Sequence, residues 1–310
     1  MSARFGHKIG DLILETSSRR QSSPTGACDY RAYVVGDIHG RLDLLEDLLT
    51  KIHAELELRP VSRTLLVFVG DLIDRGPSSA QVIERLRTYR RAAVQPIFLL
   101  GNHEEILLRI LDGESALITR WLWFGGSECL RSYGLDPAEL APLGEEDALE
   151  IIRAAIPRDH AEFLESFVDS YRFGDYLFVH AGIRPGIELE QQSQFDLRWI
   201  REPFLLDDSD HGFVVVHGHT ISNKVEERPN RIGIDTGAYR TDVLTALAIE
   251  GDERWLMDTR DTKVSAVSKR KEMPASGSSG TNSSPGSARG SWIARLYTGL
   301  AKLGLSLSRH

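Results

Sequence analysis

Residues 33–40, Tyr-Val-Val-Gly-Asp-Ile-His-Gly, are a short apolar run that stops at a glycine and then delivers Asp37 and His39. Four later apolar runs end in the same way. Their polar endings are Gly70-Asp71-Leu72-Ile73-Asp74-Arg75-Gly76, Gly101-Asn102-His103-Glu104, His180-Ala181-Gly182 and His217-Gly218-His219-Thr220. Short apolar runs are typical of buried strands, and the functional side chains of open α/β sheets gather beyond the carboxyl ends of the strands. We therefore expect these Asp, His and Asn side chains to meet at one edge of the core.

The order of the predicted elements favours an α/β fold. The first strand candidates alternate with two stretches that repeat apolar residues at helical spacing, Leu42–Leu58 and Ser78–Arg91. Such alternation is typical of helices packed on a sheet. Residues 113–170 separate the third of these strands from the fourth and are mostly helical by pattern, so we interpret them as an inserted cap.

The chain divides into four predicted segments. Residues 1–28 form an N-terminal lead-in, and residues 29–260 form the body that carries the motifs and the cap. Residues 261–291 are predicted to be a flexible linker, because residues 273–291 are mostly Ser, Gly and Pro and cannot bury enough apolar surface to fold. Residues 292–310 repeat apolar residues at helical spacing, and this amphipathic segment could contact a membrane surface or a protein.

Composition and charge limit the class of protein. The 310 residues are 41% apolar and 26% charged, which is ordinary for a globular chain. The two cysteines, Cys28 and Cys129, exclude a disulfide framework and favour a reducing, cytoplasmic location. The net charge of −8 combines +6 over residues 261–310 with −14 over the rest, and an acidic body argues against nucleic-acid binding. No apolar run reaches the roughly 18 residues of a membrane span, and the N-terminus lacks the apolar region of a secretory signal.

The residue types at the strand ends predict a site for two metal ions. Carboxylate, imidazole and amide oxygen ligands suit Mn, Fe, Zn or Mg. An Asp-x-His pair such as Asp37 and His39 can chelate one ion, and the lone Asp71 can bridge two. Asn102 with two further histidines can hold the second ion. Two ions about 3.5–4 Å apart clamp the attacking and leaving oxygens of a phosphoryl displacement, so the pattern indicates phosphoester hydrolysis.

Together the five motifs resemble those of the metal-dependent phosphoprotein phosphatase family, within the calcineurin-like metallophosphoesterase superfamily, and most closely its bacterial Ser/Thr phosphatases. All five occur in the family's order between Tyr33 and Thr220. The resemblance implies a metallophosphoesterase-type β-sandwich of two mixed sheets flanked by helices, with an inserted helical cap. It also implies two divalent metal ions, with Mn²⁺ expected first and Fe or Zn as alternatives. One ion would be held by Asp37, His39 and Asp71, and the other by Asp71, Asn102, His180 and His219.

The same resemblance assigns the groups that act on the substrate. His103 would be the general acid that protonates the leaving alkoxide, and Asp74 would orient it. Arg75 would bind the phosphate oxygens. The second phosphate-binding arginine would be Arg201 of a Trp-x-Arg pattern, with Arg198 left open as the alternative. The implied reaction is direct attack by a metal-bridging hydroxide on phosphoserine or phosphothreonine in proteins, with phosphotyrosine as a further candidate and no phosphoenzyme.

Two other functions stay open on the sequence. The first is a diadenosine tetraphosphate hydrolase on the same fold, but those relatives tend to replace the second Asp of the Gly-Asp-x-x-Asp-Arg-Gly motif, and Asp74 is present here. The second is a non-catalytic binding module, which would be expected to lack ligands, and none is missing. We favour a protein phosphatase that acts as a monomer on phosphorylated proteins or peptides.

Several neighbouring residues receive no catalytic role from the sequence. Glu104 is expected to support the site rather than bind metal, and His217 is expected either to contact a metal ligand or to lie in the core. Trp121–Gly126 in the cap could be a satellite core or a wall of the substrate groove. Asp235 follows another predicted strand near the expected crevice, and no role is assigned to it.

Overall fold

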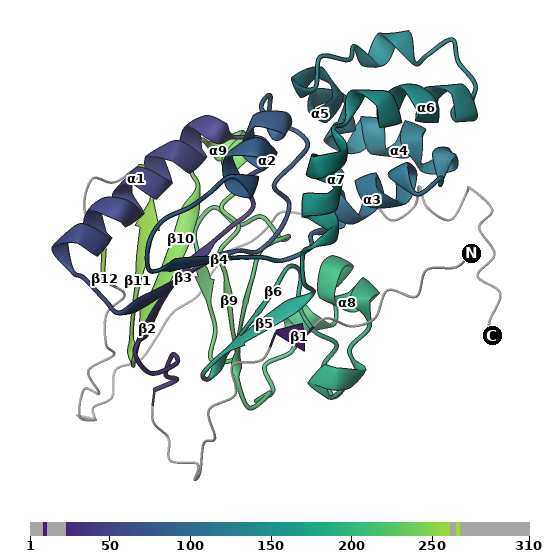
Figure 1. Cartoon of the computed structure of the whole chain (residues 1–310). Helices are drawn as coiled ribbons and strands as arrows, with labels where there is room; N and C mark the ends of the chain where they lie inside the picture. The colour runs from purple at the N-terminus through teal and green to yellow at the C-terminus, as the bar shows by residue number, and fades with distance from the viewer. Residues whose placement is uncertain (1–8, 11–22, 261–264, 267–310) are drawn as a thin grey trace, which may run out of the picture. The chain divides into compact units, whose positions relative to one another are not determined.

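The computed structural model describes residues 9–10, 23–260 and 265–266, and its strands form two six-stranded sheets (Figure 1). The strands of the first sheet, in spatial order, are β12 (Ser265–Ala266), β11 (Glu253–Asp258), β10 (Thr245–Glu250), β2 (Tyr30–Val35), β3 (Arg63–Phe68) and β4 (Val94–Phe98). The strands of the second sheet are β1 (Ile9–Gly10), β5 (Ser170–Phe173), β6 (Tyr176–Val179), β7 (Val214–His217), β9 (Arg231–Gly233) and β8 (Glu226–Glu227). The expected sandwich of two sheets is therefore confirmed.

Both sheets are mixed, and their parallel strands explain why the motifs converge. In the first sheet β2, β3 and β4 are parallel, so Val35, Phe68 and Phe98 lie side by side at the carboxyl ends. In the second sheet β6, β7 and β9 are parallel. The carboxyl ends of parallel strands meet at one edge of a sheet. The loops that follow these strands are the ones that carry the polar motifs.

Alternate residues of the inner strands face opposite ways, as the two-residue period of a strand requires. On β2, Val34 packs between the two sheets with Val67 of β3 and Phe178 of β6. Its neighbours Tyr33 and Val35 belong instead to the core beneath the helices. The strands are near-continuous apolar runs because both of their faces are buried.

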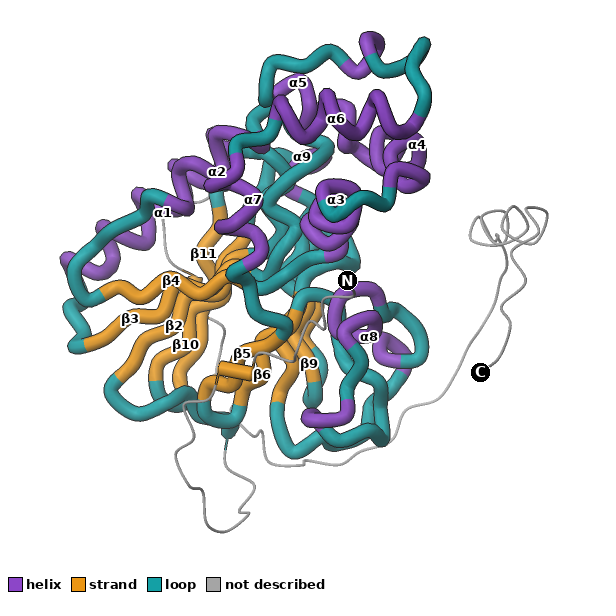
Figure 2. The backbone as a smooth tube through the Cα atoms, turned by 45° about the vertical axis from the view of Figure 1, so that its right-hand side comes forward, coloured by secondary structure: helices purple, strands orange, loops and turns teal. Residues whose placement is uncertain are grey.

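Helices cover the outer faces of the sheets (Figure 2). They are α1 (Leu42–Leu58), α2 (Ser79–Arg87), α3 (Asn102–Leu111), α4 (Ile118–Trp121), α5 (Ser127–Ser132), α6 (Glu145–Ala155), α7 (Arg158–Glu165), α8 (Gln194–Trp199) and α9 (Ala238–Thr241). α1 and α2 pack on the first sheet, whereas α8 shares a smaller core with β6 and β7. No helix in the part of the chain that the structure describes is long and apolar enough to cross a membrane.

Between α3 and β5 the chain is mainly helical. Short turns connect the helices there: η1 (Ser115–Leu117), η2 (Leu122–Gly126), whose backbone kinks at Gly125, and η3 (Pro137–Glu139). The last helix ends at Glu165 and Ser170 already begins β5, so the helical stretch is shorter than the range 113–170 assigned to the cap. Most of residues 1–28, almost all of the linker 261–291 and all of segment 292–310 lie outside the described residues, and their boundaries stay predictions.

Leu45 tests how much stability comes from the core between the helices and the first sheet. Its side chain is fully buried in that core, whereas Leu58 at the end of the same helix is 84% exposed. Leu45→Ala leaves a cavity and should lower the free energy of unfolding by about 2–5 kcal/mol, and Leu58→Ala should change it by less than about 0.5 kcal/mol. Urea denaturation followed by circular dichroism measures both, and equal effects would contradict this packing.

Candidate active site

The residues predicted to carry the chemistry come together from both sheets. The loops after β2, β3, β6 and β7 and the start of α3 supply all but one of them. Eight of the ten are buried: Asp37, His39, Asp71, Asp74, Asn102, His103, His180 and His219. Of the other two, Arg75 is half-buried and Arg201 is exposed.

The backbone at this edge holds an uncommon conformation. Five of the eight non-glycine residues with positive φ in the described chain are site residues: His39 (46°), Asp71 (50°), Asp74 (71°), Arg75 (67°) and His219 (62°). Left-handed backbone costs about 1–3 kcal/mol for such a residue and persists only where the surroundings over-determine it. Backbone strain is therefore concentrated on the residues whose side chains meet at the site.

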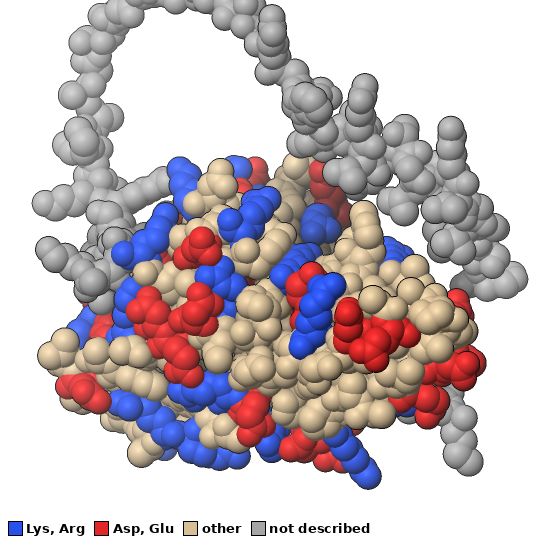
Figure 3. All heavy atoms as spheres, turned by 90° about the horizontal axis from the view of Figure 1, so that it is seen from above, with Lys and Arg blue, Asp and Glu red and all other residues tan. Residues whose placement is uncertain are grey.

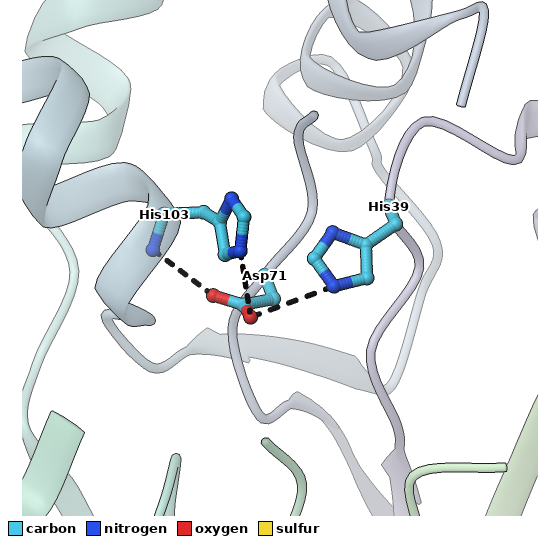
Figure 4. A group of neighbouring side chains, drawn as sticks. All are labelled: His39, Asp71 and His103. Atoms are coloured by element: carbon cyan, nitrogen blue, oxygen red, sulfur yellow. Dashed lines mark hydrogen bonds and ion pairs between the residues drawn. The ribbon is translucent and has the colours of Figure 1, made fainter. Parts of the chain in front are cut away.

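Asp71 lies at the centre of the cluster. His39 Nε2 lies 3.6 Å and His103 Nε2 3.9 Å from Asp71 Oδ2, and both imidazoles turn toward this carboxylate in Figure 4. His180 Nε2 lies 3.4 Å from Asp71 Oδ1. Asp71 belongs to two groups whose ligand atoms lie within 4.8 Å of one another, one with His39 and His103 and one with His180 and His219. A residue shared by both groups is placed as a bridging ligand would be.

Backbone carbonyls orient two of these imidazoles. Nδ1 of His39 lies 2.8 Å from the carbonyl oxygen of Ile73, and Nδ1 of His180 lies 2.8 Å from that of Val69. Since a carbonyl only accepts, each Nδ1 donates and each Nε2 keeps its lone pair. His180 Nε2 then faces another acceptor, Asn102 Oδ1, at 3.0 Å. Acceptors that converge in this way suit a cation between them.

Two buried atoms of the site, Asp37 Oδ1 and His219 Nε2, have no hydrogen-bond partner among the described residues. The other oxygen of Asp37 accepts from the backbone N–H of His219 at 3.0 Å. Burial, together with the Asp235 and Asp71 carboxyls, raises the pKa of Asp37 well above its usual value. Burying an unpaired carboxylate is costly unless a cation compensates it. The side chains present therefore fit the predicted divalent ions.

The four histidines differ in their preferred protonation state. Burial lowers the pKa of His39, His180 and His219, which keeps them in the neutral form that binds metal. Burial acts in the same direction on His103, but Asp71 and the hydrogen bond to Asp74 raise its pKa above the usual value. Three histidines are thus suited to bind metal, and the fourth is suited to give up a proton.

Asp74 and Trp121 hold His103 in place. His103 Nδ1 donates to Asp74 Oδ2 over 2.6 Å, which leaves Nε2 facing Asp71. Burial raises the pKa of Asp74, while its bonds to His103 and Trp121 lower it. Trp121 Nε1 donates to both Asp74 oxygens, at 3.2 Å and 3.0 Å. A fully buried carboxylate with these partners fixes the plane and the tautomer of the imidazole.

The two predicted phosphate-binding arginines have different surroundings. Arg75 Nη1 donates to His39 Nε2 at 2.8 Å, and its guanidinium lies 4.9 Å from the ring centre of Tyr239. Arg75 and Tyr239 also line a cavity of about 690 Å³. Arg201 is exposed, and its Nη2 donates to the carbonyl oxygen of His219 at 3.4 Å.

Arg198, the alternative to Arg201, is held in an ion-pair network. Its Nε and Nη2 donate to Asp169 Oδ1 at 2.8 Å and 2.6 Å, and its Nη1 lies 3.6 Å from Glu105. The side chain is buried in that network. Arg201 is therefore the better placed of the two to meet a phosphate.

Glu104 supports the site through the backbone. Its carboxylate accepts from the backbone N–H groups of Gly101, Asp71, Leu72 and Ile73, at 2.8–3.3 Å. Burial raises the pKa of Glu104 to about 8, and these donors oppose the rise. The sequence signal was its position, because a Glu three residues after a helix N-cap commonly reaches back to the cap N–H.

Three other residues contact the site without a role assigned from the sequence. Asp235 adjoins Asp37, Trp121 binds Asp74, and the ring of Tyr239 packs on His39 with 5.3 Å between ring centres. The place of Asp235 after a predicted strand had put it near the crevice, and its contact with Asp37 agrees with that expectation. No sequence signal indicated the contacts of Trp121 and Tyr239, because each contact joins residues that lie far apart in the sequence. His217 lies in the core against Phe204, which is one of its two expected places.

Known proteins match both the sequence and the geometry. The sequence profile of the family described as calcineurin-like phosphoesterase matches residues 30–248. The chain belongs to this family. It is thus a metallophosphoesterase, a hydrolase, and its buried Asp and His side chains are grouped so that they could hold metal ions.

The curated relatives of this metallophosphoesterase carry two kinds of name. The asymmetrical bis(5'-nucleosyl)-tetraphosphatase PrpE of Halalkalibacterium halodurans is 28% identical over 237 residues, which are 69% of this chain and 88% of that protein. Serine/threonine-protein phosphatase 1 of Salmonella typhimurium is 31% identical over 226 residues, 70% of this chain and 91% of that protein. The solved structure of a cold-active protein-tyrosine phosphatase from a Shewanella species shares the fold, with a TM-score of 0.51 at 16% identity over 77% of this chain and 82% of that chain.

Glu104→Gln tests whether the carboxylate positions the metal-binding loop. An amide has one acceptor oxygen and turns its NH₂ toward N–H donors, so the backbone from Asp71 to Ile73 should loosen and the affinity for Mn²⁺ should fall about 10–100-fold. Isothermal titration of metal-free protein with Mn²⁺ measures the affinity. Glu114→Gln, a surface glutamate paired with Arg109, is the matched control and should bind as the wild type does. Unchanged affinity in Glu104→Gln would contradict the supporting role.

Proposed function

We propose that this metallophosphoesterase is a protein serine/threonine phosphatase, which hydrolyses phosphoserine and phosphothreonine. Phosphotyrosine is a further candidate substrate. The observation that carries the proposal is the buried pair of His103 and Asp74, joined over 2.6 Å beside the acceptors gathered around Asp71. Two divalent ions, with Mn²⁺ expected first, would supply an activated water and neutralise charge on the phosphate. They would be held by Asp37, His39, Asp71, Asn102, His180 and His219.

The leaving group explains why a fixed general acid favours this substrate class. Cleavage of a phosphoserine expels an alkoxide, which is a strong base and leaves well only if it is protonated as the bond breaks. Cleavage of a dinucleoside tetraphosphate expels a nucleotide phosphate, which is already a stable anion. His103 has a raised pKa and an Nε2 turned toward Asp71, so it can donate where the leaving oxygen departs. Such a device is of most use with an alkoxide.

Arg75 and Arg201 would bind the phosphate oxygens. A planar guanidinium can give two parallel hydrogen bonds to a tetrahedral anion. Arg75 comes from the loop after β3 and is held by Tyr239, whereas Arg201 follows α8 and is tied to the loop of His219. Two arginines from separate elements would orient the phosphate relative to His103.

Surface charge and thiol state support the remaining expectations on partners and location. Figure 3 shows acidic and basic side chains interspersed on the face seen from above rather than one continuous basic area. This mixture fits a partner that is a phosphorylated protein better than a nucleic acid. Cys28 is an exposed free thiol and Cys129 a buried one, which suits the reducing conditions of a cytoplasmic location.

A dinucleoside tetraphosphatase is the second candidate, and the name of the Halalkalibacterium halodurans relative favours it. The same six ligands and two arginines could serve that reaction. The candidates differ in how much the reaction needs His103, since only one of them expels an alkoxide. Because of this difference, His103 rather than a metal ligand is the residue to test.

His103→Asn tests the proposal through its dependence on the leaving group. Turnover of a phosphoserine peptide should fall about 10²–10⁴-fold, whereas turnover of p-nitrophenyl phosphate, whose leaving group needs little protonation, should fall much less. Steady-state rates on both substrates, with Mn²⁺, measure the two losses. Asp71→Asn is the matched control and should abolish both activities, because it removes a metal ligand.

Two results would contradict the proposal. Equal losses on both substrates, with bound metal also lost, would show that His103 is a ligand rather than the acid. Wild-type protein that cleaves diadenosine tetraphosphate and leaves phosphopeptides intact would establish the second candidate.

A further inference from the structure

The turn between α4 and α5 begins with a buried aromatic side chain and carries two exposed ones. Trp121, where α4 ends, is fully buried. Trp123 is 80% exposed and Phe124 is 38% exposed, and their rings pack edge to face with 5.0 Å between ring centres. Trp is among the residues that folding and binding most often bury, so a largely exposed one next to a catalytic site calls for a function. Trp121 thus belongs to the core, and the groove-wall alternative stays open for Trp123 and Phe124.

This turn is anchored on the catalytic loop at both ends. Trp121 donates to Asp74, and the carbonyl oxygen of Gly125 accepts from the backbone N–H of Arg75 at 3.0 Å. Gly125 has a φ of 121°, and a Cβ there would lie 2.6 Å from Arg75 Cγ. Only glycine permits this approach. Trp123 and Phe124 lie between these two anchors, so they are tied to the same loop as the acid's partner and the phosphate-binding arginine.

A kink in the backbone separates the two helices at this turn. Residues 122–126 contain Gly125, whose φ of 121° and ψ of 0° lie outside the helical region, so α4 and α5 do not form one continuous helix. Trp121, at the end of α4, is buried, whereas Trp123, just before the kink, is exposed. The guanidinium of Arg120 lies 5.4 Å from the ring centre of Phe124, so Phe124 is covered on one side while Trp123 presents the larger open surface.

We propose that Trp123, backed by Phe124, binds an apolar or aromatic side chain that neighbours the phosphorylated residue in the substrate, and so sets sequence preference among phosphopeptides. The inference rests on the proposed protein phosphatase function. A phosphate bound by Arg75 leaves the flanking peptide outside the polar pocket, and an extended chain advances about 3.3–3.6 Å per residue. The turn that touches Arg75 is therefore within reach of a residue one or two positions away. Burying an apolar side chain against an indole contributes favourable free energy that a glycine cannot supply.

A panel of phosphoserine peptides tests this inference. The peptides carry Phe or Gly at each of the two positions before and after the phosphoserine, and kcat/KM is measured for each with Mn²⁺. Wild-type protein should prefer Phe at one or more positions, and Trp123→Ala should reduce that Phe-to-Gly ratio roughly tenfold. Trp123→Phe, which keeps an aromatic ring, should restore most of the ratio. Leu58→Ala removes a comparably exposed apolar side chain from the far end of α1 and should leave the ratio unchanged.

The outcomes separate this inference from the proposed function. A ratio that is the same in wild-type protein and Trp123→Ala, with both hydrolysing the peptides, would overturn the inference and leave the phosphatase standing. No hydrolysis of any phosphopeptide by wild-type protein would overturn both. If Trp123→Ala instead raised KM for diadenosine tetraphosphate and left the peptide ratios unchanged, the surface would bind a nucleobase, and the proposal for a peptide would be wrong. The Phe-to-Gly ratio compares two peptides cleaved by the same variant, so it does not depend on what fraction of that protein is active. Thermal melting is therefore needed only to show that each variant folds.

Discussion

This site depends on one constraint: buried hydrogen-bond acceptors converge there, and too few hydrogen-bond donors lie between them. Asp37, Asp71 and Asp235 are carboxyl groups at one edge of the sandwich, and the neutral nitrogens of His180 and His219 face the same space. Such a cluster would be strongly unfavourable if it stayed without positive charge. Bound divalent cations would remove that cost, and the same charge would activate a water and bind a phosphate. The stability and the chemistry of this edge would then depend on the same ions.

Much of the surrounding structure holds these acceptors in place. The left-handed backbone of His39 and Asp71 turns their side chains into the same space, and the carboxylate of Glu104 ties the loop after β3 to the start of α3. A side chain at Gly101 would collide with Asp71, so the glycine before Asn102 is needed for this close approach. The helical region contributes through Trp121, whose indole N–H donates to Asp74, the hydrogen-bond partner of His103.

The sequence predicted the parts of this arrangement that local pattern encodes. Apolar runs that end in polar residues located the strand ends, and parallel pairing then placed His39, Asp71 and His180 at one edge. The same patterns missed β5 and β11, because neither is a continuous apolar run: β5 contains Arg172, and β11 begins with Glu253 and Arg254. They also missed the bond from Trp121 to Asp74 and the ring of Tyr239 on His39. Those contacts depend on how an inserted segment folds back over the site, and no short-range period carries that information.

Crystals of the protein loaded with Mn²⁺ test the central claim most directly, through anomalous scattering collected near the manganese edge. The account predicts two manganese peaks about 3.5–4 Å apart, with Asp71 contacting both, Asp37 and His219 as ligands, and His103 bound to neither ion. A single peak, or two peaks that Asp71 does not bridge, would contradict it.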